Sequence, residues 1–242
     1  MHIVVDIGNT RTKTGEFRDN ELHETRSFDS LDTCRDFLHS RSCEAIIVSS
    51  VSTRSEELIS HSSPLYSKTL FFSHSTPIPL DIGYKTPHTL GLDRLAAACG
   101  AATVYPGENS LVIDAGTSIT YEIVERGKKY LGGAISPGLH MRAKALHTFT
   151  ARLPLIELPA SASLIGDDTR SCLESGILNG ARGEIRDFIR MYHEKFSNLR
   201  IVICGGDAKF FESVSNTPVL VIPELVLLGL NAILNYNVQK NG

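Results

Sequence analysis

The chain uses one group of chemically active residues twice: an apolar strand that ends in Asp-x-Gly and is followed by hydroxyl or amide side chains. The first copy runs from Ile3 to Thr10 and is closed by Lys13, and the second runs from Leu111 to Ser118 and is closed by Thr120. A buried strand delivers the carboxylate to its carboxyl end, and the glycine lets backbone N–H groups approach an anion. A partly alternating, β-branched stretch follows each copy. We therefore interpret each as a β-hairpin whose tip holds phosphate while its aspartate binds a cation or the water around it.

Ordinary strand-to-turn junctions are the alternative interpretation, because Asp, Gly and Asn are common turn residues. Either copy alone leaves the two interpretations evenly balanced, and their occurrence as a pair favours phosphate binding. The chain contains neither Gly-x-x-x-x-Gly-Lys-Ser/Thr nor Gly-x-Gly-x-x-Gly. The pattern is therefore not that of a Walker loop or of a dinucleotide site.

A second reactive segment, Tyr84 to Arg94, places an acid and a base before an alanine-rich helix that we expect over Leu95 to Val104. Asp93 could accept the proton of a substrate hydroxyl while Arg94 binds an anion, a division of roles that phosphoryl transfer needs. The alternative is that Asp93 only caps the helix, since acidic side chains favour helix amino termini. This segment by itself favours capping.

Two glycine-rich segments could line a ligand site. Ile201 to Ala208 is an apolar strand that runs into Gly-Gly-Asp, and Gly132 to Gly138 follows the second expected hairpin. Gly-Gly lets the backbone lie against a planar or anionic group. A tight turn with Asp207 as the N-cap of a helix, and a plain loop before another helix, explain the same residues.

The composition fits an enzyme and indicates neither nucleic-acid nor membrane binding. The chain has 242 residues, of which 42% are hydrophobic, and a formal charge of -3. Its Lys and Arg residues are scattered, without a basic stripe. Five cysteines without a Cys-x-x-Cys pair suit reduced thiols, and no signal segment or membrane-spanning apolar run is present. We expect a cytoplasmic protein with no nucleic-acid or membrane partner.

The order of the expected elements repeats. The first part reads as three strands, a helix, a strand, a helix and a strand, at 2–7, 12–17, 21–27, 30–40, 45–49, 54–61 and 70–72. The pattern begins again with strands at 110–114, 119–125 and 129–135, helices at 138–147 and 169–196, a strand at 200–204, and helices at 207–213 and 224–236. The stretch 76–91 reads as loop. This repetition predicts two related α/β halves, 1–109 and 110–242, that face each other across a cleft.

Together these segments resemble the type III pantothenate kinases, which belong to the acetate and sugar kinase, heat-shock chaperone and actin superfamily. The resemblance rests on segments in the same order along nearly the whole chain: Asp6 to Lys13, Tyr84 to Pro87, Gly91 to Arg94, Asp114 to Thr120, Gly132 to Gly138 and Gly205 to Ala208. It implies an α/β protein of two duplicated ribonuclease H-like (actin-like ATPase) halves. Each half is expected to be a mixed sheet flanked by helices, with a central cleft between the two.

The resemblance also implies an activity, the ATP-dependent phosphorylation of pantothenate to 4'-phosphopantothenate, which opens coenzyme A synthesis. Mg2+ would accompany ATP, and Asp114 would hold a monovalent cation, K+ or NH4+. Asp93 would be the proton acceptor, which changes its interpretation from cap to base. The residues that would bind ATP are Asp6, Ile7, Gly8, Asn9, Thr10, Arg11, Thr12, Lys13 and Thr117. The residues that would bind pantothenate are Tyr84, Gly91, Leu92, Asp93, Arg94 and Thr169.

Thr169 would act from the neighbouring subunit of a homodimer, and helix capping is its alternative role. One departure from the family pattern is Cys204, which stands where many members have Thr and leaves a hydroxyl contact to the nucleotide in question. His140 and His147 lack the partners of a zinc site and are expected to be surface or packing residues. A second hypothesis for function is a nucleotide-binding regulatory protein of the same fold that does not turn over substrate. Asp93 and Arg94 favour the kinase, because a protein that only binds needs no acid beside a substrate pocket.

Overall fold

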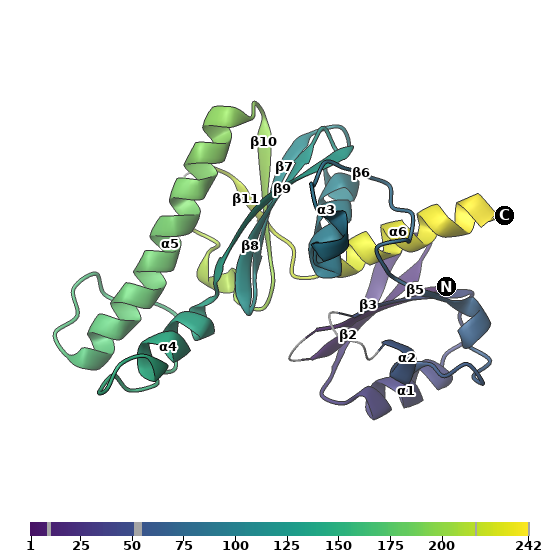
Figure 1. Cartoon of the computed structure of the whole chain (residues 1–242), viewed down its shortest axis with the longest axis horizontal. Helices are drawn as coiled ribbons and strands as arrows, with labels where there is room; N and C mark the ends of the chain where they lie inside the picture. Colours follow the sequence, from purple (N-terminus) through teal and green to yellow (C-terminus); the bar gives the residue numbers. More distant parts are fainter. Residues whose placement is uncertain (9–10, 51–54, 216, 242) are drawn as a thin grey trace. The chain divides into compact units, whose positions relative to one another are not determined.

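The computed structural model describes residues 1–8, 11–50, 55–215 and 217–241. These residues form two compact units (Figure 1). Unit 1 comprises Met1–Pro106, Lys128–Tyr130 and the carboxyl-terminal segment from Glu224, and unit 2 comprises Gly107–Gly127 and Leu131–Pro223. The arrangement of the two units relative to each other, and with it the expected central cleft, stays a prediction.

Unit 1 is built on a mixed sheet with the strand order β3-β2-β1-β4-β5. Its strands are β1 (His2–Ile7), β2 (Thr12–Arg18), β3 (Glu21–Phe28), β4 (Ala45–Ser50) and β5 (Thr69–Phe71). Strand β2 is antiparallel to both β1 and β3, whereas β1, β4 and β5 run parallel. The other elements of this unit are α1 (Leu31–His39), α2 (Ser55–Leu58), η1 (Tyr66–Lys68), β6 (Asp81–Ile82), η2 (Pro87–Thr89), α3 (Leu92–Val104) and α6 (Leu225–Asn241). Strand β6 pairs in parallel with Lys129 and Tyr130.

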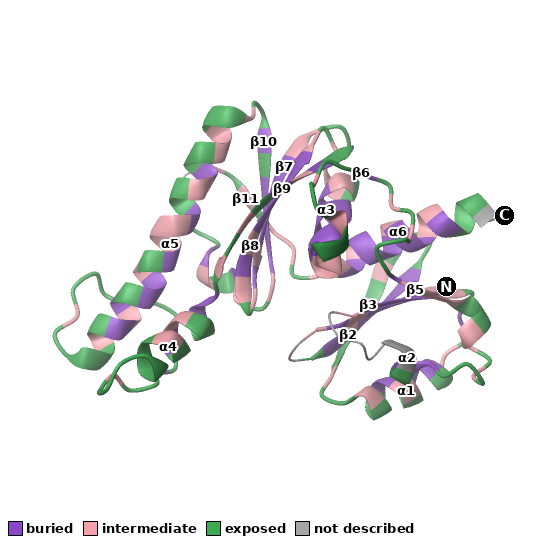
Figure 2. Ribbon diagram, in the orientation of Figure 1, coloured by how far each residue is buried: buried purple, intermediate pink, exposed green. Residues whose placement is uncertain are grey.

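Strand β1 carries apolar side chains on both of its faces, because helices cover the sheet of unit 1 on both sides. Ile3, Val5 and Ile7 pack with Cys34 and Leu38 of α1 on one face. Helix α6 packs against β1, β2 and β4. Figure 2 shows buried residues concentrated in these strands and along α3 and α6. The sheet is therefore held rigidly around the carboxyl end of β1, where Asp6 lies.

The backbones of helices α3 and α6 are in direct contact where the two helices cross. A Cβ atom added at Gly229 of α6 would lie 1.7 Å from the carbonyl oxygen of Ala96 in α3, far inside van der Waals contact. Only glycine fits at this crossing. The carboxyl-terminal helix thus fixes α3, whose first turn carries Asp93 and Arg94.

Unit 2 repeats the sheet of unit 1. Its strands are β7 (Asn109–Ala115), β8 (Ser118–Glu125), β9 (Lys129–Pro137), β10 (Leu199–Cys204) and β11 (Val219–Val221). Their order, β9-β8-β7-β10-β11, matches β3-β2-β1-β4-β5, again with an antiparallel hairpin and parallel strands beside it. Helices α4 (Leu139–Thr148) and α5 (Thr169–Lys195) and the 3-10 turn η3 (Ala208–Phe210) complete the unit. The predicted duplication is confirmed at the level of strand order.

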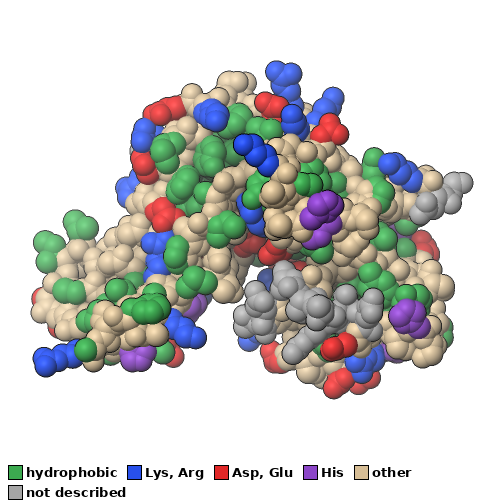
Figure 3. Space-filling view, viewed as in Figure 1, with side chains coloured by type: hydrophobic (Ala, Val, Ile, Leu, Met, Phe, Trp, Pro, Cys, Tyr) green, Lys and Arg blue, Asp and Glu red, His purple; other side chains and the backbone are tan. Residues whose placement is uncertain are grey.

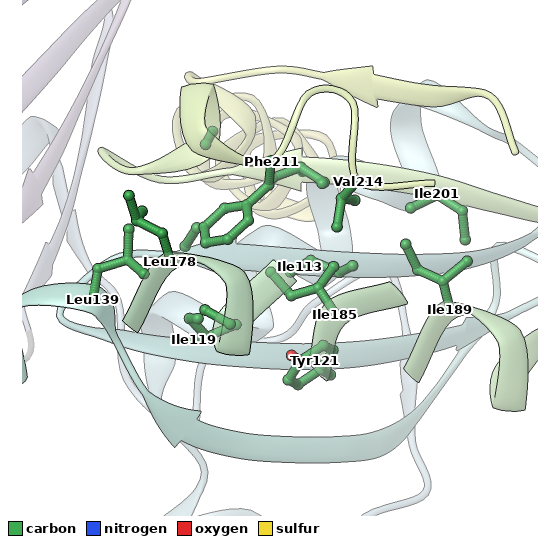
Figure 4. Close-up of a cluster of buried hydrophobic side chains, with 14 of the residues drawn as sticks. Ile113, Ile119, Tyr121, Leu139, Leu178, Ile185, Ile189, Ile201, Phe211 and Val214 are labelled. Carbon is green, nitrogen blue, oxygen red and sulfur yellow. The ribbon is translucent and has the colours of Figure 1, made fainter. Parts of the chain in front are cut away.

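The core of unit 2 lies between its sheet and α5. Figure 4 shows Ile113, Ile119 and Tyr121 from the strands meeting Ile185 and Ile189 from the helix. The Tyr121 ring stacks on Phe188 with 4.2 Å between ring centroids. This packing matters below, because the Tyr121 hydroxyl donates to the partly buried carboxylate of Glu184 at 2.9 Å.

The structure confirms most predicted strands and helices and corrects several. The predicted helix at 207–213 is wrong, since only the short turn η3 forms there. The helix predicted at 54–61 is limited to Ser55–Leu58 within the described residues, and Arg54 lies outside them. The three-residue strand β11 follows Pro218 and precedes Pro223, and proline-flanked strands of this length have little pattern to detect.

The two units also differ from the predicted halves, 1–109 and 110–242, because α6 belongs to unit 1. Helix α6 begins with an apolar run, Leu225 to Leu228, so the sequence pattern does not indicate which sheet it covers. The crossing at Gly229 places it on α3.

Candidate active site

Asp6 lies at the carboxyl end of β1, in the centre of the sheet of unit 1. Lys13 of β2 is its antiparallel register partner, and Ser49 of β4 is its parallel one. The Oδ1 atom of Asp6 and the Oγ atom of Ser49 are shielded from solvent, and neither has a hydrogen-bond partner within the described residues. Buried polar atoms normally have partners, so this pair of oxygens indicates a place for a ligand.

The electrostatics of Asp6 point the same way. Burial, and after it the Asp93 carboxylate, raise the pKa of Asp6 from its ordinary 3.8 to about 6, and Lys13 opposes both effects. The carboxylate is therefore short of positive charge in the free protein. A hydrated Mg2+ fits this position, because the ion prefers carboxylate oxygens and keeps several waters when it binds with substrate phosphates.

The hairpin tip after Asp6 holds the other predicted phosphate-binding residues. Ile7 is the buried last residue of β1, and the Gly8 N–H donates to the carbonyl oxygen of Arg11 at 3.1 Å, which closes the tip. Arg11 is exposed and lies 3.5 Å from Asp29. Thr12 is buried as the first residue of β2. The predictions for Asn9 and Thr10 fall outside the described residues.

Helix α3 brings its first turn to the Asp6 carboxylate. Gly91 is the N-cap and Leu92 the first helical residue, so the helix starts three residues earlier than expected. Asp93 Oδ1 accepts a hydrogen bond from the Arg94 N–H at 2.8 Å, and Arg94 is buried. The Asp93 side chain thus accepts from a backbone N–H in the first turn, as the capping interpretation expects, although Gly91 is the N-cap. The Asp93 carboxylate also raises the pKa of Asp6, so the two acids interact electrostatically.

Tyr84 follows β6 and is half-buried, with its ring centroid 6.1 Å from that of Tyr130. The two rings are tilted at 52° to each other, and Tyr130 is fully buried. This contact gives Tyr84 a defined place in unit 1 and leaves part of its ring accessible.

In unit 2, Asp114 occupies the position that Asp6 has in unit 1. It is half-buried near the end of β7, opposite Thr120 of β8 and Cys204 of β10. The turn that follows is closed by a hydrogen bond of 3.0 Å from the Gly116 N–H to the carbonyl oxygen of Ser118, and Thr117 is exposed at its tip. An acid beneath a hydroxyl-bearing turn is the arrangement that the sequence predicts.

The Gly-Gly-Asp segment packs directly onto this turn. Gly205 has a φ of +91°, and a Cβ atom there would lie 2.3 Å from Asp114 Oδ1. The Asp207 N–H donates to the carbonyl oxygen of Ala115 at 2.9 Å. Burial raises the pKa of Asp207, whereas His140 and Lys209 lower it. His140 was expected to be a surface or packing residue, and only the fold reveals that it lies near this acid.

Thr169 lies apart from the other predicted residues of unit 2. It is the exposed first residue of α5, and Asp168 is the N-cap, with its side chain accepting from the Ser171 N–H. Capping therefore does not explain Thr169. It lines a cavity of about 460 Å3 with Leu146, Leu153, Asp167, Asp168 and Cys172 among others. Of the described residues that we predicted for the site, Thr169 alone borders this cavity.

These arrangements define the chemistry that each unit offers. Unit 1 presents a pair of acids, a lysine and a closed hairpin tip, whereas unit 2 presents an acid, a threonine and two further backbone segments around them. No three His, Cys, Asp or Glu side chains gather as a metal-binding group in residues 1–8, 11–50, 55–215 and 217–241. Such sites suit Mg2+ held by one or two carboxylates and substrate phosphates better than a transition metal.

No helix in the described part of the chain is both long and apolar enough to cross a membrane. Similarity to solved structures is at the level of fold. A Baf family protein from Campylobacter jejuni matches with a TM-score of 0.66 and 20% identity, over 98% of this chain and 99% of the other. Component A of the (R)-2-hydroxyglutaryl-CoA dehydratase of Acidaminococcus fermentans matches with a TM-score of 0.55 and 13% identity, over 100% and 99%.

The activator of the 2-hydroxyisocaproyl-CoA dehydratase from Clostridium difficile, solved with bound ADPNP, has a TM-score of 0.52 and 12% identity, over 100% of this chain and 97% of the other. With the repeated strand order, these neighbours confirm the duplicated ribonuclease H-like fold.

Sequence relatives are much closer. The family model for type III pantothenate kinase matches residues 2–191. The type III pantothenate kinase of Cytophaga hutchinsonii is 40% identical over 98% of this chain and 100% of its own length. That of Christiangramia forsetii is 41% identical over 98% and 99%. The chain belongs to the type III pantothenate kinase family.

Proposed function

We propose that this chain transfers the γ-phosphoryl group of ATP to the terminal hydroxyl of pantothenate, which makes 4'-phosphopantothenate for coenzyme A synthesis. The observation that carries the proposal is the pair Asp6 and Asp93 in a chain that belongs to this family. Burial and the Asp93 carboxylate raise the pKa of Asp6, and Asp93 itself lies in the first turn of α3. Phosphoryl transfer needs both a metal ligand and a proton acceptor at one place.

ATP would be bound by residues 6–13 and by Thr117. Lys13 and the backbone donors of the hairpin tip offset the charge of the phosphates, and Asp6 holds Mg2+ or its water shell. The metal ion, when bound, neutralises charge that develops on the transferred group. Asp114 would hold K+ or NH4+ within unit 2, a role supported by its half-buried carboxylate beneath the Thr117 turn.

Pantothenate would be bound by Tyr84, by Gly91 to Arg94 and by Thr169. A primary alcohol has too high a pKa to attack unaided at neutral pH, so the Asp93 carboxylate removes its proton as the bond to phosphorus forms. The buried Arg94 guanidinium can pair with the pantothenate carboxylate, which matches its planar fork of donors. This division of roles makes Asp93 the residue that touches the reacting hydroxyl.

The activity is tested by following ADP formation with and without pantothenate in a potassium buffer. We expect ADP to form in proportion to pantothenate, and an analogue that lacks the terminal hydroxyl should give none. Replacement of K+ by Na+ should lower the rate, because the two ions differ in size at the proposed Asp114 site. Turnover without pantothenate dependence would favour the nucleotide-binding regulatory protein, and indifference to the cation would remove the role of Asp114.

The functional form would be a homodimer in which Thr169 reaches the partner's pantothenate. Exposed apolar side chains in the segment between α4 and α5 support this, since Phe149, Leu164 and Ile165 are 85%, 82% and 83% exposed. Figure 3 shows hydrophobic side chains over α4 and the segment beside it, at the lower left of the view. Apolar surface of this kind marks protein interfaces.

A mixing experiment tests the shared site. Asp93→Asn and Thr169→Ala chains should each be poorly active alone, whereas refolding them together should restore about a quarter of the wild-type activity per chain. Half of randomly formed dimers are mixed, and each mixed dimer has one complete site of two. If the mixture shows only the average of the two parent activities, Thr169 acts within its own chain or not at all.

A further inference from the structure

Glu184, in the middle of α5, collects donors from three other elements of unit 2. Its Oε1 atom accepts from the Tyr121 hydroxyl of β8 at 2.9 Å and from Ser136 Oγ of β9, and its Oε2 atom accepts from Arg142 Nη2 of α4. Burial would raise the pKa of Glu184, but the hydrogen bonds from Ser136, Arg142 and Tyr121 outweigh it and lower the pKa. The group is therefore a carboxylate throughout the neutral range.

The anchor beneath this carboxylate is rigid. Tyr121 is fully buried, and its ring stacks on Phe188 at 4.2 Å within the core seen in Figure 4. Burial raises the pKa of the Tyr121 hydroxyl far above its ordinary value, so it remains a neutral donor. One oxygen of Glu184 is thus tied to the core of the unit, and the other is free to orient the arginine.

From Arg142 the chain of contacts continues to the proposed phosphate-binding turn. Arg142 Nε donates to the carbonyl oxygen of Pro137 at 2.9 Å. The next residue, Gly138, donates its N–H to the carbonyl oxygen of Thr117 at 3.2 Å. Arg142 therefore uses one edge of its guanidinium on Glu184 and another on the peptide that supports Thr117.

A purely stabilising role explains this arrangement poorly. Arg142 and Glu184 are partly buried, with side chains 22% and 24% exposed. Ion pairs that are removed from water add little net stability compared with packed apolar residues, because desolvation of the charges offsets their attraction. What an ion pair provides is a fixed geometry, and here the fixed group is the backbone under Thr117. The interaction is also selective, since other glutamates of α5, such as Glu194, pair with arginines of the same helix at its exposed surface.

We propose that Glu184 is a positioning residue for nucleotide binding: through Arg142 and the Pro137–Gly138 peptide it holds Thr117 where it can donate to a phosphate of ATP. The proposal rests on the proposed role of Thr117 in the kinase. Glu184 itself touches neither ATP nor pantothenate in this scheme. Its loss should therefore weaken the ATP side of the reaction selectively.

The test is Glu184→Gln, which keeps the shape of the side chain and removes its charge. We expect the KM for ATP and the Kd for ATP, measured by calorimetry with excess Mg2+, to rise about tenfold, the scale of one lost positioning interaction. The KM for pantothenate should change less than twofold. Glu194→Gln is the matched control, because it breaks a Glu–Arg pair at 2.6 Å on the same helix without a link to the turn.

Unchanged ATP affinity in a folded Glu184→Gln chain, or an equal loss for both substrates, would overturn the proposal. If that chain does not fold, Arg142→Lys decides, since it retains the positive charge but cannot span Glu184 and Pro137 together. It should raise the Kd for ATP to a similar extent. The calorimetric readout needs no turnover, so failure of the kinase activity in the wild-type chain is recognised separately from failure of this proposal.

Discussion

The Asp93→Asn chain is expected to turn over pantothenate more slowly by about two or more decades while its affinity for ATP changes little. Asparagine keeps the size of the side chain and an oxygen that can still accept from the Arg94 N–H. This hydrogen bond of 2.8 Å lies in the first turn of α3. Asparagine cannot take a proton from a hydroxyl. The substitution therefore separates the role of a base from the role of a helix cap.

The measurement is kcat from ADP formation at saturating pantothenate, together with the Kd for ATP. Asp32→Asn is the matched control, because Asp32 is likewise the second residue of a helix, α1, and pairs there with Arg35 at 2.8 Å. The control should turn over normally. A normal rate in Asp93→Asn as well would reduce Asp93 to a capping residue and leave the proton acceptor of the reaction elsewhere.

The sequence was sufficient to predict the duplicated sheet. In the sequence, each half begins with a hairpin that has an Asp-x-Gly tip and continues with alternating helices and strands. The strand orders of the two units agree with this pattern. Helix α6 was different, because its side chains indicate burial and not the partner that buries them. Only the close backbone crossing at Gly229 assigns it to α3, and hence to the unit that carries Asp93.

Within the site, residues that share a local motif were predictable and residues that meet through the fold were not. Asp6 and Lys13 belong to one hairpin, and their pairing follows from its register. Ser49, whose Oγ is buried beside Asp6, comes from a different strand with no motif of its own. Glu184 lies in a helix rich in charged residues, so nothing in the sequence separates it from its exposed neighbours.

The aspartates of the two duplicated turns have different neighbours in their sheets. Lys13 and Ser49 flank Asp6, whereas Thr120 and Cys204 flank Asp114 at the same register positions. The first acid therefore has a lysine at its antiparallel register position, whereas the second has a threonine there. A polyphosphate with Mg2+ suits the first surroundings, and a single monovalent cation, with less charge to balance, suits the second. This difference gives the duplicated Asp-x-Gly turns distinct proposed roles.

Asp6→Asn is expected to abolish kinase activity and to stabilise the free protein at neutral pH. The pKa of Asp6 is 3.8 in an unfolded chain and about 6 in the fold, so the native state binds this proton more tightly than the unfolded state. Ionisation therefore costs native stability. The cost is absent below pH 3.8, grows as the pH rises through about 6, and is constant above that. Asparagine carries no charge to bury beside Asp93, so the variant escapes the cost.

The free energy of unfolding, from urea titrations at pH 5, 6, 7 and 8 without metal, measures this effect. The variant should exceed the wild type by about 1–3 kcal/mol at pH 7 and 8 and by less at pH 5. Mg2+ should narrow the gap, because a cation at Asp6 stabilises its ionised form in the wild type alone. Asp81→Asn, which removes an equal charge from the exposed strand β6, should show no such pH dependence. If the difference in the free energy of unfolding between variant and wild type is the same at every pH, burial and Asp93 do not raise the pKa of Asp6. The pair Asp6 and Asp93 would then not be explained as a cation-binding site.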